Sequence, residues 1–168
     1  YGYMLGDYVR DKDAVTASML LTEMAAWYAA QGMTLFDALN ALYEKYGYYA
    51  EKTHNLVMPG LDGLRDMAEL MRKLKDEPPT EIAGTEVVVR KDYNDGTVHD
   101  CRTGAVTKME LSGSNVLRFE LADGTTILAR PSGTEPKIKV YILARGKDAV
   151  DAAANVEKYG AWAEALKG

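Results

Sequence analysis

One turn near the C-terminal end combines the residue types that bind phosphate. Residues 129–141 read ARPSGTEPKIKVY. An arginine presents a planar fork of donors that matches two phosphate oxygens, and the serine and threonine add hydroxyl donors. The glycine allows close approach of the backbone, whose successive N–H groups can form an anion-binding nest. The predicted phosphate site comprises Arg130, Ser132, Gly133 and Thr134, with Lys137 and Lys139 adding positive charge.

The same turn has a second interpretation. Apolar residues alternate on both of its sides, in TTILAR before it and in IKVYILA after it, which predicts two strands joined by the turn. Many Ser-Gly-Thr turns only connect strands and leave their charges in water. The residue types of the turn alone therefore leave both interpretations open.

Composition limits the class of protein. Of the 168 residues, 47% are hydrophobic and 27% are charged, which is typical of a folded protein. The net charge of −5 argues against a nucleic-acid binder. A single cysteine, Cys101, favours a reducing compartment, and we expect the cytoplasm. No apolar run is long enough for a membrane helix, and the charged first residues do not resemble a signal peptide. The chain begins without Met, as an excised fragment would.

The first third of the sequence predicts two helices and one extended segment. Residues 14–30 lack glycine and proline and are apolar nearly all round, which predicts a helix buried on most sides and capped by Asp11 or Asp13. Thr34 and Asp37 form a capping box for a second helix. Residues 48–58 read as extended. Trp27, like Trp162 and the tyrosines, is interpreted as a core residue.

The remainder predicts an α+β domain. A helix is expected from Pro59 to Asp76, followed by four strands in a mostly antiparallel sheet, and then by a helix that Asp148 caps. Both helices are expected on one face of the sheet. The predicted boundaries are residues 1–55 for a mainly helical remnant of an α/β domain and residues 56–168 for the C-terminal domain.

Three stretches resemble the α-D-phosphohexomutases, the family of phosphoglucomutase and phosphomannomutase. RPSGTEPKIK at residues 130–139 is similar to the phosphate-binding loop of that family's last domain. GYMLGDYVRDKDAV at residues 2–15 is similar to the segment just after its sugar-recognition loop. YEKYGYYAEK at residues 43–52 resembles the branch related to phosphoglucomutase and phosphopentomutase. The resemblance covers nearly the whole chain in family order.

The resemblance implies a fragment of a four-domain enzyme. In the family, a phosphoserine on the first domain gives its phosphoryl group to a sugar phosphate, and the resulting bisphosphate returns the other phosphoryl group. Residues 1–55 would end the third, sugar-binding domain. Residues 56–168 would be the fourth domain, which clamps the phosphate that is not transferred. The implied parent interconverts sugar 1-phosphates and 6-phosphates, glucose phosphates above all, with mannose or pentose phosphates as alternatives. Implied cofactors are Mg²⁺, held on another domain, and glucose 1,6-bisphosphate.

The resemblance also assigns roles and leaves gaps. Lys12 matches a family lysine that faces the reacting end of the sugar, and Arg10 lies beside it. The chain has no Asp-x-Asp-x-Asp loop and hence no predicted metal site. Residues 53–56 (THNL) are faintly similar to the family's nucleophile loop, but their place in the chain is wrong, so His54 is interpreted as a linker or surface histidine. His99 is interpreted as part of a solvated loop.

Two expectations follow for the isolated chain. We expect it to be inactive alone, with the upstream domains of the same polypeptide and a sugar phosphate as its partners. Residues 14–30 would then expose apolar surface and let the chain associate with itself. A stand-alone phosphate-binding module and a structural docking domain, in which the turn merely connects strands, are the alternatives to a mutase fragment.

Overall fold

The computed structural model describes residues 3–8 and 10–167 and divides the chain into two compact units, Tyr1–Tyr46 and Gly47–Gly168. Each unit is described by itself. None of the helices in the described part of the chain combines the length and apolar character that a bilayer crossing requires.

The first unit contains two capped helices. Helix α1 spans Ala14–Ala29, and the Asp13 carboxylate accepts hydrogen bonds from the first-turn backbone. Helix α2 spans Leu35–Tyr46. Its capping box forms as predicted, since the N–H of Thr34 donates to Asp37 Oδ2 over 2.8 Å and the N–H of Asp37 donates to Thr34 Oγ1 over 3.1 Å.

The apolar helix α1 is not buried, which corrects the sequence-based prediction. None of its residues is buried, and Met19 and Trp27 are 69% and 60% exposed. The prediction rested on apolar character, but the described part of this unit offers only α2 and the short segment 3–8 as neighbours of α1. The expected exposed apolar surface of the fragment is therefore present on this helix.

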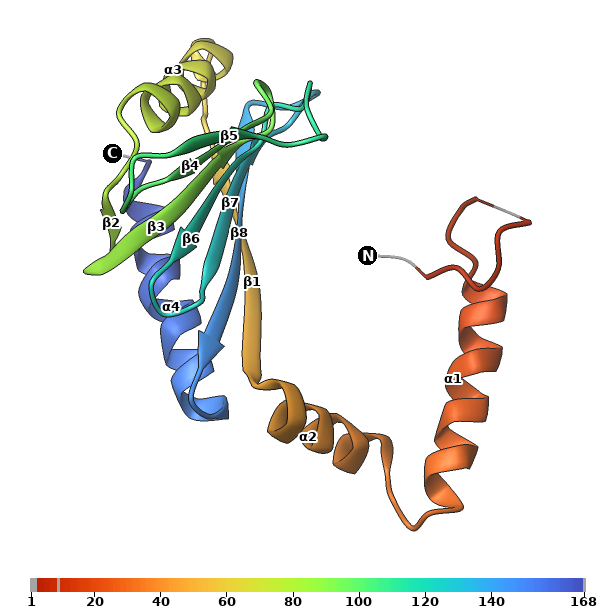
Figure 1. Cartoon of the computed structure of the whole chain (residues 1–168). Coiled ribbons are helices and arrows are strands. Elements are labelled where there is room, and N and C mark those ends of the chain that lie inside the picture. The colour runs from red at the N-terminus through yellow and green to blue at the C-terminus, as the bar shows by residue number, and fades with distance from the viewer. Residues whose placement is uncertain (1–2, 9, 168) are drawn as a thin grey trace. The chain divides into compact units, whose positions relative to one another are not determined.

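The second unit is a sheet covered by two helices (Figure 1). The strand pairings within the described residues are antiparallel, and the order is β1-β8-β7-β6-β3-β4-β5, with β2 paired to β3. The helices are α3 (Gly63–Asp76) and α4 (Ala149–Ala165). The strands are β1 (Tyr48–Val57), β2 (Glu81–Ile82), β3 (Thr85–Asp92), β4 (Thr97–Asp100), β5 (Val106–Lys108), β6 (Leu117–Leu121), β7 (Thr126–Pro131) and β8 (Lys137–Gly146).

The α+β class is confirmed, but the sheet has eight strands where the sequence predicted four. The polar segment around His99, interpreted above as a solvated loop, contains β4, which pairs with β3 and with β5. Its short strands lack the apolar alternation on which the prediction relied.

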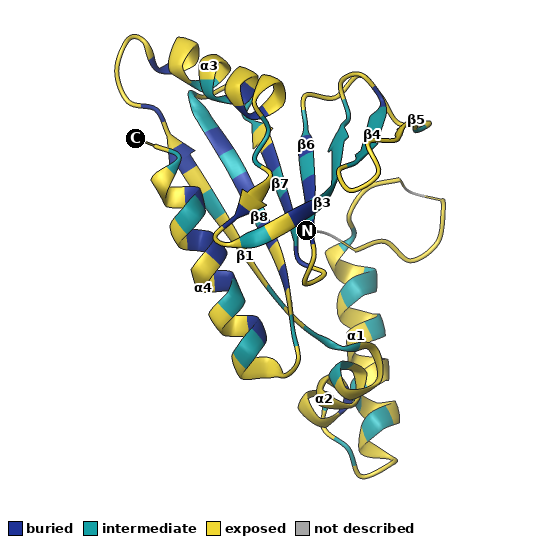
Figure 2. Cartoon of the chain, turned by 60° about the vertical axis from the view of Figure 1, so that its left-hand side comes forward, coloured by how far each residue is buried: buried dark blue, intermediate teal, exposed yellow. Residues whose placement is uncertain are grey.

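The core lies on one face of the sheet, beneath both helices, as predicted. Alternate residues of β6, β7 and β8 are buried and form one cluster with Met71 and Leu74 of α3 and with Val156 and Tyr159 of α4. Figure 2 shows the buried positions of the two helices on their sheet-facing sides. The intervening residues of the strands point to the opposite face, which neither helix covers; we call this the open face.

Strand β1 places the start of the second unit earlier than the predicted boundary at residue 56. It pairs with β8 along its whole length, from Tyr48 opposite Gly146 to Val57 opposite Lys137. His54, interpreted above as a linker or surface residue, is instead part of this strand. Its side chain is only 11% exposed, and Nδ1 lies 2.9 Å from Glu164 Oε1 on α4. Strand pairing with β8 therefore orders a segment that the sequence assigned to the preceding domain.

Candidate functional site

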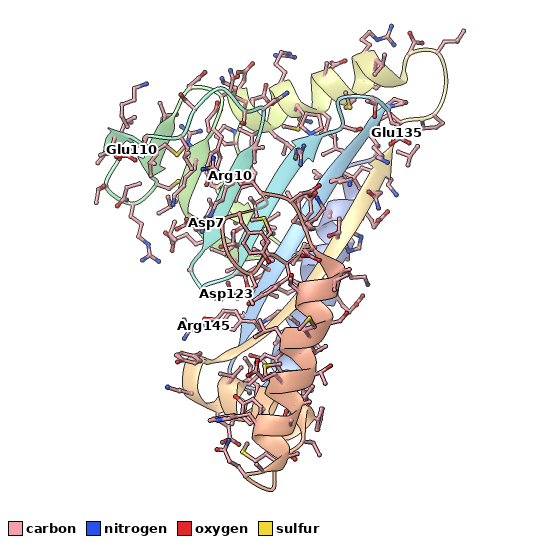
Figure 3. All side chains as sticks on the ribbon, turned by 90° about the vertical axis from the view of Figure 1, so that its right-hand side faces the viewer. Asp7, Arg10, Glu110, Asp123, Glu135 and Arg145 are labelled. Atoms are coloured by element: carbon pink, nitrogen blue, oxygen red, sulfur yellow. The ribbon has the colours of Figure 1, made fainter. Side chains whose placement is uncertain are left out.

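Hydrogen bonds fix both ends of the predicted phosphate loop, which joins β7 to β8. The N–H of Ser132 donates to the carbonyl of Lys137 over 2.8 Å. The N–H of Met58, just after β1, donates to the carbonyl of Pro136 over 2.8 Å. Figure 3 places Glu135 at the end of the sheet beside α3, and Asp123 and Arg145 at the other end. The loop is thus anchored at both ends by backbone hydrogen bonds.

The middle of the loop leaves backbone donors available. In the part of the chain that the structure describes, the N–H groups of Gly133 and Glu135 have no protein acceptor. The N–H of Thr134 makes only a long bond of 3.4 Å to Ser132 Oγ. A methyl group on Gly133 would meet no atom within 4 Å. The loop therefore offers exposed donors beside open space, which an anion could occupy.

Two cations of the predicted site face each other across the strands. Arg130 on β7 is directly opposite Lys139 on β8. Like charges in this position destabilise a sheet. Among the described residues, neither side chain has a hydrogen bond or an ion pair. Lys139 interacts with the charge of Glu135, and no other charge interaction is found for the pair within the described residues. The pair concentrates positive charge at the end of the open face nearest the loop.

A second pair of like charges on the open face is neutralised. Lys91 on β3 is opposite Arg118 on β6. Glu120 lies between them, 2.8 Å from Lys91 Nζ and 3.0 Å from Arg118 Nη2. A carboxylate therefore bridges the opposed side chains of Lys91 and Arg118, whereas no carboxylate bridges those of Arg130 and Lys139 among the described residues. Of these four cations, Arg130 and Lys139 are the two that have no ion pair among the described residues.

Lys137 differs from the other two predicted cations. Its Nζ lies 2.5 Å from Glu135 Oε2, and this hydrogen bond is the main cause that lowers the pKa of the Glu135 carboxyl. The charge of Lys137 is therefore largely balanced within the loop. Its contribution to binding an anion stays a prediction, as do the contributions of Arg130, Ser132, Gly133, Thr134 and Lys139.

Arg10 and Lys12 lie in the other compact unit. Lys12 Nζ is 2.6 Å from Asp11 Oδ1, and both side chains are exposed. The stretch 2–15, which resembles the family segment, includes Gly2 and Val9, which lie outside the described residues. The role of Arg10 and Lys12 at the reacting end of a sugar stays a prediction.

The sequence analysis missed one polar pair, Arg90 and His99. His99, interpreted as part of a solvated loop, lies on β4 opposite Arg90 of β3, and Arg90 Nη2 is 3.3 Å from its Nδ1. Burial, and then the charge of Arg90, lowers the pKa of His99. Cross-strand pairing brings the two together, and only recognition of β4 as a strand could have revealed it.

The described residues contain no cluster of three His, Cys, Asp or Glu side chains that could hold a metal ion.

Comparisons with known proteins agree with this fold. Residues 55–157 match the family model of the phosphoglucomutase/phosphomannomutase C-terminal domain. A phosphoglucomutase of Staphylococcus aureus is 36% identical over 142 residues, which are 84% of this chain and 26% of that relative. A phosphoglucomutase of Staphylococcus haemolyticus is 35% identical over the same shares.

A solved structure shares the fold at lower identity. The crystal structure of parafusin, a phosphoglucomutase from Paramecium in its open form, matches with a TM-score of 0.57 and 18% identity, over 95% of this chain and 28% of that one. The chain thus spans about a quarter of the length of the relatives it matches. With its sheet, its β7–β8 loop and the family match over residues 55–157, the chain belongs to the phosphoglucomutase/phosphomannomutase family and contains the C-terminal domain of that family.

Proposed function

We propose that this chain is the C-terminal part of a sugar-phosphate mutase and that its β7–β8 loop holds the phosphate that is not being transferred. The free amides at Gly133 and Glu135 and the unpaired cations Arg130 and Lys139 support this role. The contrast with the neutralised pair of Lys91 and Arg118 is the main support, because opposed like charges without a bridging carboxylate destabilise a sheet and a bound phosphate would relieve their repulsion.

A grip on the distant phosphate would aid the reaction by orientation. Phosphoryl transfer depends mainly on positioning and on stabilisation of charge. In the proposed reaction, a phosphoserine upstream of this chain gives its phosphoryl group to the free hydroxyl of a sugar monophosphate. The bisphosphate formed, glucose 1,6-bisphosphate for a glucose substrate, turns over and returns its other phosphoryl group to the serine. In both steps the loop would fix the far end of the sugar.

The other parts of the proposed enzyme lie outside this chain. The reacting serine and Mg²⁺ would belong to upstream domains of the same polypeptide, and Mg²⁺ would stabilise charge on the transferred group when bound. Relatives named phosphoglucomutase support a glucose phosphate as substrate. We expect the chain alone to give no turnover of glucose 1-phosphate with glucose 1,6-bisphosphate and Mg²⁺, as measured by formation of glucose 6-phosphate.

The phosphate grip can be tested in the isolated chain. Titration with glucose 6-phosphate, followed by backbone amide NMR, should shift the signals of residues 132–135, whereas glucose should not. Lys139→Gln should weaken binding roughly tenfold, the loss expected for one charge-assisted hydrogen bond. Lys147→Gln, at an exposed lysine beyond the far end of β8, is the matched control and should bind normally. Equal shifts with glucose, or unchanged binding by Lys139→Gln, would contradict the proposal.

A further inference from the structure

Two cavities flank the pair of Arg90 and His99 on the helix-covered side of the sheet. One cavity of about 220 Å³ lies between the C-terminal end of α3 and strands β3 and β4. The other, of about 470 Å³, lies beside the segment 78–80 that follows α3. Arg90 and His99 line both, together with Pro78. We call the smaller cavity the Arg90–His99 pocket.

The carboxylates that line the two cavities already have partners. Asp92 and Asp95 each place an oxygen 2.8 Å from Lys75 Nζ, and these hydrogen bonds, that of Asp92 first, raise the pKa of Lys75. Glu86 lies 2.6 Å from Arg102 Nη2. Asp76 lies 3.2 Å from Arg72 Nη1, and Asp100 accepts from the N–H groups of Arg102 and Thr103. Each of these carboxylates therefore has a partner, and among them the charge of Asp92 also acts on His99.

Arg90 is the exception among the cations. Lys75 and Lys91 are ion-paired to carboxylates. Of the lysines and arginines among the described residues that line the two cavities, only Arg90 has no carboxylate partner. It is half-buried, so water screens its charge only in part. A cation placed in this way favours a negatively charged ligand.

The histidine adds a second donor. Arg90 Nη2 donates to His99 Nδ1, which requires Nδ1 to be unprotonated and places the ring proton on Nε2. Burial, and then the charge of Arg90, lowers the pKa of His99, which favours the neutral form of the ring. The pair therefore offers the remaining N–H groups of a guanidinium and one imidazole N–H. This set can bind both oxygens of one carboxylate.

The floor of the pocket is apolar. Leu74 of α3 and Leu117 and Phe119 of β6 line it, and all three are buried. A pocket of about 220 Å³ is smaller than the sites of drug-sized ligands, which occupy roughly 300–1,000 Å³. Its dimensions and lining suit a compact apolar body that carries one anionic group.

We propose that the Arg90–His99 pocket is a second ligand site, which binds a small organic carboxylate with a short apolar body. The carboxylate lies against Arg90 and His99, and its body lies over Phe119 and Leu117. The site uses none of the residues of the β7–β8 loop, so it does not depend on the proposed phosphate grip. Free inorganic phosphate lacks an apolar body and binds it less well.

The two histidines of the chain supply the assay. Imidazole NMR signals of His99 and His54 are followed during titration of the whole chain with benzoate, against sodium chloride at equal ionic strength. The His99 signals should shift and saturate, while those of His54, which lies on β1 against α4, should not move and should report an intact fold. A parallel titration with inorganic phosphate should shift the His99 signals less and only at higher concentration.

Arginine variants test whether Arg90 binds the carboxylate of the ligand. Arg90→Gln should weaken benzoate binding roughly ten- to a hundredfold, as expected for a lost hydrogen-bonded charge. Arg65→Gln, at an exposed arginine near the start of α3 that lines neither cavity, should bind like the parent chain. If Arg90→Gln fails to fold, as the His54 signals would reveal, Arg90→Lys keeps the charge, loses the fork and should still weaken binding. A His99 response that chloride or phosphate reproduces, no response at all, or wild-type affinity in the folded Arg90 variants would overturn the proposal.

Discussion

Replacing Arg130 by glutamine should stabilise the fold while it weakens phosphate binding. Arg130 and Lys139 are opposed in register without a carboxylate between them. Two unit charges about 7 Å apart in a dielectric of about 80 repel by about 0.6 kcal/mol, which lies within the range of about 0.2–1 kcal/mol for cross-strand pairs. We therefore expect Arg130→Gln to raise the free energy of unfolding by roughly half a kcal/mol.

The same substitution, Arg130→Gln, should weaken phosphate binding although it stabilises the fold. Hydrogen bonds to charged groups contribute about 1.5–3 kcal/mol, so Arg130→Gln should weaken glucose 6-phosphate binding roughly ten- to a hundredfold. Urea unfolding followed by circular dichroism measures the first effect, and isothermal titration calorimetry measures the second. Added salt should reduce both effects, because the side chain is exposed.

Arg118→Gln is the matched control on the same face. Arg118 also opposes a lysine, but Glu120 bridges the two. Its removal breaks an ion pair, so the free energy of unfolding should fall by up to about 1 kcal/mol, and phosphate binding should not change. Equal destabilisation by both substitutions, or loss of phosphate binding in Arg118→Gln alone, would refute the assignment of Arg130 and Lys139 as the free cations.

Three further outcomes are expected. Gly63→Ala would place a methyl carbon 2.2 Å from the carbonyl oxygen of Met58 and should lower the urea midpoint of unfolding. Gly133→Ala has open space around the new methyl group, so it should leave this midpoint nearly unchanged and impair phosphate binding. The folded state lowers the pKa of His99, so below the ordinary pKa of histidine the unfolded chain binds more protons than the folded chain. The free energy of unfolding should therefore fall between about pH 7 and pH 5. His99→Gln should reduce this fall, as measured by urea titrations at the two pH values. Removal of residues 1–46 should abolish any self-association seen by light scattering, and persistence of oligomers in the shortened chain would show that α1 is not the cause.

The sequence predicted the elements whose pattern is local. Alternating apolar residues identified β6, β7 and β8, and Asp148 caps α4 through a hydrogen bond from Asp151 as its position predicted. The phosphate site at the β7–β8 loop was suggested by residue types, because glycine, hydroxyl and guanidinium groups occur together over four positions, and by the family resemblance; it stays a prediction. Such features need no knowledge of distant parts of the chain.

Long-range pairing explains what the sequence could not predict. Residues 48–58 were expected to be extended, but Glu51, Lys52 and His54 are polar and hide the alternation of β1, and only its partner β8 determines its register and its place in the sheet. Lys52 Nζ reaches Glu157 of α4 over 2.8 Å, so even the polar residues on the core side of β1 are held by tertiary contacts. The contrast between the two like-charged pairs on the open face depends in the same way on which strands are neighbours.

The position of β1 determines where the C-terminal domain can be cut. The family match begins at residue 55 and ends at residue 157, so a protein trimmed to that span would lose most of β1 and the last two turns of α4. The backbone edge of β8 would then be unpaired from Val140 to Gly146, and Tyr159 and Ala163 would be missing from the core. An unpaired edge of this kind recruits strands from other molecules. A soluble excised domain therefore has to begin by Gly47, ahead of the first residue pair that closes the sheet.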